Sequence, residues 1–117
     1  MIICVALALA GAVTASLALA ATPTPRTVKV GDNYFVRPTG LPKITVKRNT
    51  TVKFHFIGQD PHNIFGYRGS TSGTPKFKSS IKTSGYYNKK LTTTGTYKIV
   101  CDIHGKNDQS MKIVVTP

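Results

Sequence analysis

The sequence predicts an all-β domain, built as an antiparallel Greek-key sandwich or barrel, and three observations favour this class. The 117-residue chain contains no Glu, and all its Ala residues precede position 22, whereas Val, Ile, Thr, Tyr and Phe are frequent beyond it. Residues of these β-branched and aromatic types are enriched in strands. All seven Pro and nine of the ten Gly also follow position 22 and divide the chain into short segments. In several segments apolar and polar residues alternate, which is the period of a half-buried strand.

The expected strands recur at intervals of about 8–12 residues, the spacing typical of sandwiches and barrels. They span residues 27–30, 34–36, 43–47, 51–57, 86–91, 96–101 and 110–115. In the segment 51–57 the alternation places His55 on the outer, exposed face. Residues 66–80 are polar and leave loop, short helix and strand all open. The expected core residues are Phe54, Phe56, Phe65, Tyr97, Ile99, Ile113 and Val115.

The N-terminal segment differs sharply from this body in composition. Residues 1–21 carry no charge and end in Ala18-Leu19-Ala20, a small-residue pattern of the kind found at signal-peptide cleavage sites. We therefore expect residues 1–21 to be a signal peptide cleaved near Ala21, residues 22–26 a linker, and residues 27–117 the domain. The prediction is a secreted or periplasmic protein. The alternative is an uncleaved membrane anchor, because about 20 apolar residues can span a bilayer.

Cleavage of the leader removes Cys4 and leaves Cys101 as the single cysteine of the body. A secreted domain with one thiol forms no internal disulfide, so this cysteine is either a buried thiol or a metal ligand. His104 follows Cys101 by three residues, and His62 lies upstream, just after another expected strand. One thiolate, two imidazoles and a weak axial ligand form the donor set of a blue-copper electron-transfer site. One cysteine with two widely separated histidines fits the paired ligands of structural zinc sites poorly.

These motifs resemble those of type 1 (blue) copper proteins of the cupredoxin family, nearest the plastocyanin and amicyanin branch. The resemblance covers residues 27–117 and is carried by Asp60-Pro61-His62-Asn63, Gly95-Thr96-Tyr97, Cys101-Asp102-Ile103-His104 and Lys112-Ile113-Val114-Val115. It implies a cupredoxin-like copper-binding domain in which His62, Cys101 and His104 hold one copper ion that cycles between Cu(I) and Cu(II). It also implies that the Asn63 backbone N–H donates to the Cys101 sulfur, and that His104 lies at the surface.

Two residues compete for the axial position. When the Cys-x2-His-x4-Met pattern of plastocyanin-like proteins is laid on this chain without gaps, its Met falls on Gln109. Gln replaces Met as the axial ligand in the stellacyanin branch of the family. The rival is Met111, with a spacing from His104 that is two residues longer. Both side chains fall on one face of the expected strand, so periodicity does not separate them. An oxygen donor stabilises Cu(II) more than a thioether does, so Gln109 would give the lower reduction potential.

The chain is strongly basic, with sixteen Lys and Arg against four Asp and a formal net charge of +12. The cations are spread over strands and loops without a stripe of interleaved aromatic residues, which argues against binding to nucleic acid. A positive field of this kind favours redox partner proteins with acidic docking surfaces. It also suits association with an anionic membrane or wall surface. We expect the protein itself to be a monomer.

The combined expectation is a secreted or periplasmic blue-copper electron carrier that performs one-electron outer-sphere transfer and is not an enzyme. Two alternatives stay open. One is a copper-binding or copper-delivery protein without redox turnover. The other is a metal-free basic β-sandwich that acts as an interaction module. The sequence identifies neither the redox partners nor the reduction potential.

Overall fold

The computed structural model describes residues 11–12, 21–35 and 42–117, so the expected signal peptide lies almost wholly outside the described residues. The described chain forms strands and no helix. In chain order the strands are β1 (Arg26–Gly31), β2 (Tyr34–Phe35), β3 (Lys43–Lys47), β4 (Thr50–Phe56), β5 (Phe65–Arg68), β6 (Phe77–Lys78), β7 (Tyr86–Leu91), β8 (Gly95–Val100) and β9 (Ser110–Thr116). No helix within these ranges has the length and apolar character needed to cross a membrane.

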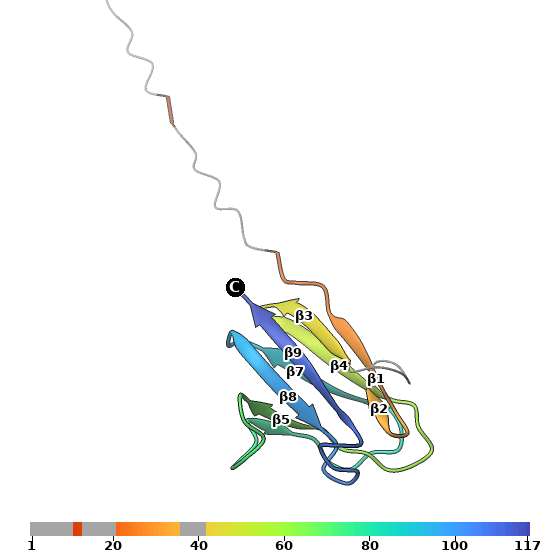
Figure 1. Ribbon diagram of the computed structural model, residues 1–117. Coiled ribbons are helices and arrows are strands. Elements are labelled where there is room, and N and C mark those ends of the chain that lie inside the picture. The colour runs from red at the N-terminus through yellow and green to blue at the C-terminus, as the bar shows by residue number, and fades with distance from the viewer. Residues whose placement is uncertain (1–10, 13–20, 36–41) are drawn as a thin grey trace, which may run out of the picture.

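The strands form two sheets that pack face to face (Figure 1). One sheet has four strands in the order β2-β1-β4-β7, and the other has five in the order β3-β9-β8-β5-β6. The hydrophobic core lies between the two sheets and consists of buried apolar side chains from both of them. Along β4, for example, every second residue is buried, as the alternation predicts. The all-β sandwich predicted from the sequence is therefore confirmed.

Two strand pairs are parallel, whereas the sequence predicted an antiparallel sandwich. β1 pairs with β4 in parallel, and β3 pairs with β9 in parallel. Between these two strands of the parallel pairs, β3 and β4, the chain changes sheets through a tight turn at Arg48 and Asn49. Asn49 has a φ of 72°, a left-handed conformation that Asn adopts more readily than most residues. The parallel neighbours, β1 with β4 and β3 with β9, are strands far apart in the sequence, and local alternation does not reveal their relative direction.

The core matches the expected set with one exception. Phe65 is only partly buried, whereas Ile64 beside it is fully buried at 0 % exposure. Gly66 is also buried, and a Cβ there would overlap the ring of Phe77. Since Ile64 and Gly66 face inward, Phe65 between them falls on the outer side of the pleat. The prediction of Phe65 as a core residue is therefore wrong.

The segment 66–80, which the sequence left open, contains strand rather than helix. β5 and the two-residue β6 pair antiparallel at the edge of the five-stranded sheet. The residues between these two strands form bends and loop. Short edge strands of this kind limit the number of backbone groups left free for unwanted pairing.

Four chain connections meet at one end of the sandwich, at the lower edge of Figure 1. The parallel pairing of β1 with β4 places their C-terminal ends side by side. β5 and β9 both begin opposite the point where β8 ends. A backbone bridge between His62 and Lys82 joins the β4–β5 connection to the β6–β7 connection. All the residues of the expected metal site lie on these connections or at the start of β9.

Candidate metal centre

The β8–β9 connection is folded on itself by four backbone hydrogen bonds, one of them from Asp108 N–H to the Gly105 carbonyl at 3.3 Å. Gly105 N–H donates to the Cys101 carbonyl at 2.8 Å, and Gln109 N–H donates to the Gly105 carbonyl at 3.1 Å. Cys101 N–H in turn donates to the Gln109 carbonyl at 3.1 Å. Gly105 has a φ of 84°, a conformation that glycine adopts without strain. The result is a compact loop with Cys101 and Gln109 opposite each other at its base.

The β4–β5 connection is fixed beside this loop. His62 exchanges two backbone hydrogen bonds with Lys82, at 3.0 and 2.8 Å. The Asn63 side chain accepts a hydrogen bond from the backbone N–H of Asp102 at 2.8 Å, through Oδ1. The bond between Asn63 and Asp102 joins segments 39 positions apart and holds the β4–β5 connection against the β8–β9 connection. The N–H bond from Asn63 to sulfur implied by the family resemblance stays a prediction; the side chain of Asn63 links the two loops instead.

His62, Cys101 and His104 converge in space, with one ligand atom from each residue lying within 4.8 Å of the others. Cys101 Sγ is 3.3 Å from His104 Nδ1 and 3.8 Å from His62 Nδ1. His62 and Cys101 are fully buried, whereas His104 is half-buried. The three residues that the sequence predicts as metal ligands therefore lie together, with Nδ1 of each imidazole facing the Cys101 sulfur.

Gln109 completes the group from the base of the loop and is itself fully buried. Its Nε2 donates to the backbone carbonyls of Gly31 at 2.7 Å and Tyr34 at 2.9 Å. Because both amide protons are used in this way, Oε1 must point in the opposite direction. It lies 2.9 Å from His62 Nδ1. The donor atom of Gln109, one of the two axial candidates, is thus held beside the His62 ring.

The remaining nitrogen of the His62 ring contacts an acidic residue. His62 Nε2 donates to Asp32 Oδ1 at 2.9 Å. The carboxylate also accepts backbone hydrogen bonds from Gln59 at 3.0 Å and Asp60 at 3.1 Å. The hydrogen bond with His62, followed by these two backbone bonds, lowers the pKa of Asp32 from 3.8 to about 2. No role for Asp32 is predicted from the sequence, because residues 31–33 indicate only a break between two expected strands.

The donor set fits a cation of the copper type. With the Nε2 proton directed to Asp32, Nδ1 of a neutral His62 ring presents a lone pair. Gln109 Oε1 presents another lone pair at 2.9 Å, so two acceptors face each other. A cation bound between them, or a second proton on the ring, turns this repulsion into attraction. The nearby Cys101 thiol and His104 imidazole add the soft donors that select copper over hard cations.

Met111, the rival axial candidate, and His55, the third histidine, both lie on strands. Met111 is buried in β9 opposite Ile99 and belongs to the core. His55 lies on the outer face of β4 as expected, but it is half-buried because its ring stacks on Tyr86, with centroids 4.2 Å apart. The carboxylates of Asp102 and Asp108 are exposed.

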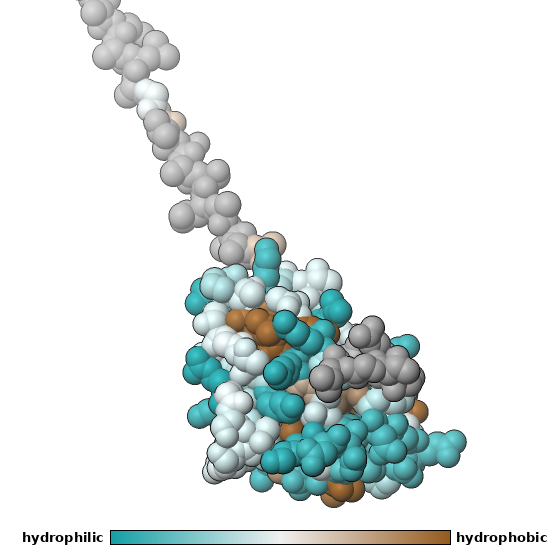
Figure 2. All heavy atoms as spheres, in the orientation of Figure 1, coloured by the Kyte–Doolittle hydropathy of each residue, from teal (hydrophilic) through white to brown (hydrophobic). Residues whose placement is uncertain are grey.

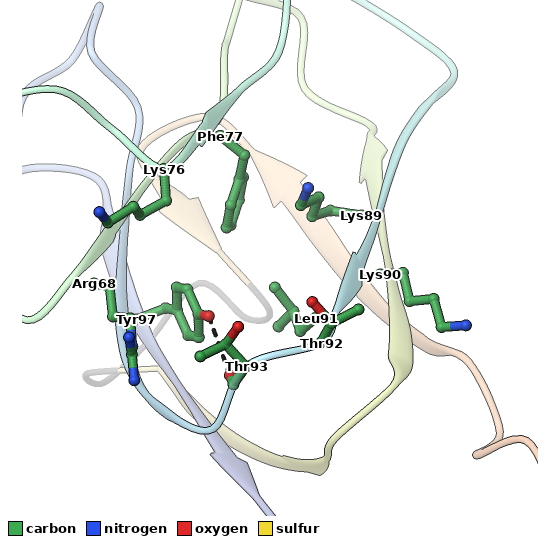
Figure 3. A pocket seen from close by; sticks show the side chains of 9 residues that line it. All are labelled: Arg68, Lys76, Phe77, Lys89, Lys90, Leu91, Thr92, Thr93 and Tyr97. Carbon is green, nitrogen blue, oxygen red and sulfur yellow. Dashed lines mark hydrogen bonds between the residues drawn. The ribbon is translucent and has the colours of Figure 1, made fainter.

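A separate pocket of about 300 Å³ opens at the opposite end, where β5 and β7 finish and β8 begins. We call it the cationic pocket; its lining includes Arg68, Lys76, Lys89 and Lys90. Figure 3 shows that the charged ends of these four side chains point in different directions rather than toward one centre. Arg68 donates to the Thr94 carbonyl at 2.8 Å, and Lys89 Nζ lies 5.5 Å from the centroid of the Phe77 ring. The pocket therefore has charge without the convergence of a binding site.

Comparison with solved structures identifies the fold. A purple cupredoxin from Nitrosopumilus maritimus matches with 22% identity and a TM-score of 0.62, over 78% of this chain and 99% of that chain. A fern plastocyanin variant matches with 22% identity and a TM-score of 0.61, over 77% and 99%. An amicyanin variant matches with 24% identity and a TM-score of 0.59, over 78% and 81%.

The sequence itself matches no family model and no curated protein. The structural likeness nevertheless shows that the chain has the cupredoxin fold, which the resemblance of its motifs implied. The His-Cys-His cluster lies on the two connections that carry the motifs around His62 and Cys101.

Proposed function

We propose that this protein is a blue-copper electron carrier and not an enzyme. The observation that supports the proposal is the convergence of one buried thiol and two imidazoles on a cupredoxin fold. His62, Cys101 and His104 would hold a single copper ion, with Gln109 as the weak axial donor. Such a set accommodates both oxidation states of copper.

The surrounding residues suit a site that changes little between oxidation states. A bound copper ion would supply the one-electron chemistry, so that the protein could take an electron from a reduced donor and pass it to an oxidised acceptor. The chain contributes donors that are already in place. The backbone bridge fixes His62, Asp32 and Gln109 hold the two sides of its ring, and Cys101 is buried.

His104 is the proposed exit for the electron. It is half-buried, and the neighbouring Ile103 is 46% exposed. Apolar surface is visible at the lower tip of the body in Figure 2, the end that carries the β8–β9 connection. A partner that docks there would approach the ring without displacing any buried group.

The partner that we propose is a redox protein with an acidic surface. The net charge of +12 attracts such a protein over a distance. All four carboxylates, however, belong to the connections of the metal end: Asp32, Asp60, Asp102 and Asp108. We therefore infer that the acidic groups of the partner contact the cationic flanks, while its redox centre faces the apolar tip. Secretion to the periplasm or the exterior, inferred from residues 1–21, would place the carrier beside such partners.

The decisive experiment is addition of Cu(II) to the purified metal-free protein, followed by visible and electron paramagnetic resonance spectroscopy. We expect an intense thiolate-to-copper charge-transfer band that Cys101→Ser abolishes. His55→Gln is the matched control, because this histidine lies on the outer face and its loss should leave the band intact.

A colourless copper-treated protein would refute the proposal. A coloured protein that gives no reversible voltammetric wave, and that loses its copper readily to chelators, would favour a copper-delivery role instead.

A further inference from the structure

Asp32 lies on a two-residue hairpin turn at the metal end. β1 and β2 pair through Gly31 and Tyr34, so Asp32 and Asn33 form the turn between them. Asn33 has a φ of 62°, which supports so tight a reversal. The side chain of Asp32 is 38% exposed, while that of His62, which it contacts, is 1% exposed. The turn therefore brings a carboxylate from solvent to the edge of a buried ring.

The position of this carboxylate is closely determined. Its two oxygens accept three hydrogen bonds, from His62 Nε2 and from the backbone N–H groups of Gln59 and Asp60. Gly58 leaves the space that the carboxylate occupies, because a Cβ at this position would overlap Asp32 Oδ1. The Asp32 carboxylate is therefore held by three hydrogen bonds and packs directly against the backbone of Gly58.

We propose that Asp32 is a positioning residue for His62, holding the proton on Nε2 so that Nδ1 faces the cluster, and that its charge favours Cu(II) over Cu(I). The second part rests on the copper site proposed above. Carboxylates that accept the distal N–H of a ligating histidine orient the ring and raise its basicity in other metal sites. Here the same carboxylate also fixes the loop that carries the histidine.

The direction of the effect on the reduction potential follows from charge. A negative carboxylate on the far side of the His62 ring stabilises the ion with the higher charge more than the ion with the lower charge. Removing the charge should therefore weaken Cu(II) binding more than Cu(I) binding, which raises the reduction potential. Loss of such a partner typically weakens metal affinity about 10- to 100-fold.

The first arm of the test compares Asp32→Asn with Asp60→Asn. Asn at position 32 keeps an oxygen toward His62 but removes the charge, whereas Asp60 is exposed and contributes only its backbone N–H to the network. We expect Asp32→Asn to lose about tenfold in the ratio of Cu(II) to Cu(I) affinity, a rise of about 59 mV for a one-electron couple. Asp60→Asn should leave both quantities unchanged.

The second arm displaces the carboxylate and keeps its charge. Gly58→Ala places a methyl group where Asp32 Oδ1 lies, so the carboxylate must move away from His62. We expect this variant also to lose Cu(II) affinity, although its net charge equals that of the wild type. Equal potentials and affinities in the wild type, Asp32→Asn and Gly58→Ala would overturn the proposed tuning of copper.

The third arm needs no metal. Nitrogen NMR of the His62 ring in the metal-free protein should show the proton on Nε2 in the wild type and a mixture of tautomers in Asp32→Ala. Should Asp32→Ala fail to fold, Gly58→Ala gives the same reading. An unchanged tautomer would overturn the positioning role. A wild-type protein that binds no copper would refute the proposed function instead, and this arm would still decide whether Asp32 positions the ring.

Discussion

The metal end and the cationic pocket both gather polar side chains, but they arrange them in opposite ways. At the metal end, the donor atoms of His62, Cys101 and His104 lie within 4.8 Å of one another, and Gln109 Oε1 points toward them. In the cationic pocket, the four charged ends point apart (Figure 3). Charge and concavity are present in the pocket, yet only the metal end has atoms that a single ion could contact together.

This difference separates two kinds of electrostatic contribution. Converging donors select a ligand by geometry, so one substitution there changes the chemistry of the site. Dispersed cations contribute to a long-range field, in which each charge adds a small and salt-sensitive part. In Figure 2 the hydrophilic residues lie in several separate places on the visible face of the body, with paler surface between them.

The largest contrast should appear in stability. Gln109→Leu leaves the carbonyls of Gly31 and Tyr34 without their donor, and we expect a loss of about 2–4 kcal/mol in the metal-free protein, since each buried unpaired group costs about 1–3 kcal/mol. Arg68→Met in the cationic pocket breaks one exposed bond and should cost about 0.5 kcal/mol or less. Urea denaturation measures both values. Equal losses would show that the two regions do not differ in the way described.

A smaller effect should separate the axial candidates. Gln109→Met replaces an oxygen donor with a thioether, so the reduction potential should rise, because Cu(II) loses more stabilisation than Cu(I). Met111→Leu conserves volume in the core and should leave the potential and spectrum unchanged. Voltammetry of the two copper-loaded variants gives the answer. A shifted spectrum in Met111→Leu with none in Gln109→Met would assign the axial role to Met111.

The smallest effect should come from the field. The double substitution Lys89→Gln, Lys90→Gln should slow electron exchange with the anion hexacyanoferrate about twofold at low salt, without moving the potential. Asp108→Asn, which removes a negative charge at the metal end, should change the rate in the opposite direction. Stopped-flow kinetics at low and high ionic strength measures both. A change that persists at about 1 M salt would contradict a field effect, because the screening length there is about 3 Å.

Much of the fold was predictable because alternation is a local property. The strand at residues 43–47 and the strand at residues 86–91 have the bounds predicted from the sequence. The parallel pairing of β1 with β4 was not predictable in this way, since it depends on which sheet each strand joins. The prediction of Phe65 as a core residue was wrong for a related reason. Its neighbour Ile64 is the residue that faces inward, and local alternation does not indicate which of the two does so.

The site residues also differ in whether a local motif or a distant contact identifies them. Cys101 and His104 are close in sequence and His62 follows a clear strand, so their meeting was foreseeable from motif order. The choice between Gln109 and Met111 as axial ligand stays a prediction. The sequence does not reveal that two carbonyls of the β1–β2 hairpin, some 75 positions away, hold the Gln109 amide. Asp32 belongs to the same hairpin and escaped notice for the same reason: no local pattern ties it to His62.

Gln109, directly before β9 of one sheet, is bonded to the hairpin of the other sheet, so the metal end also joins the two halves of the sandwich. An ion that binds only the folded metal end adds its binding free energy to the folded state, about 2.7 kcal/mol at a free concentration one hundred times its Kd. A thermal melt would then double as an assay of occupancy. Metal-free molecules would lack this contribution to the free energy of unfolding. We therefore expect proteases to degrade them sooner than metal-bound molecules.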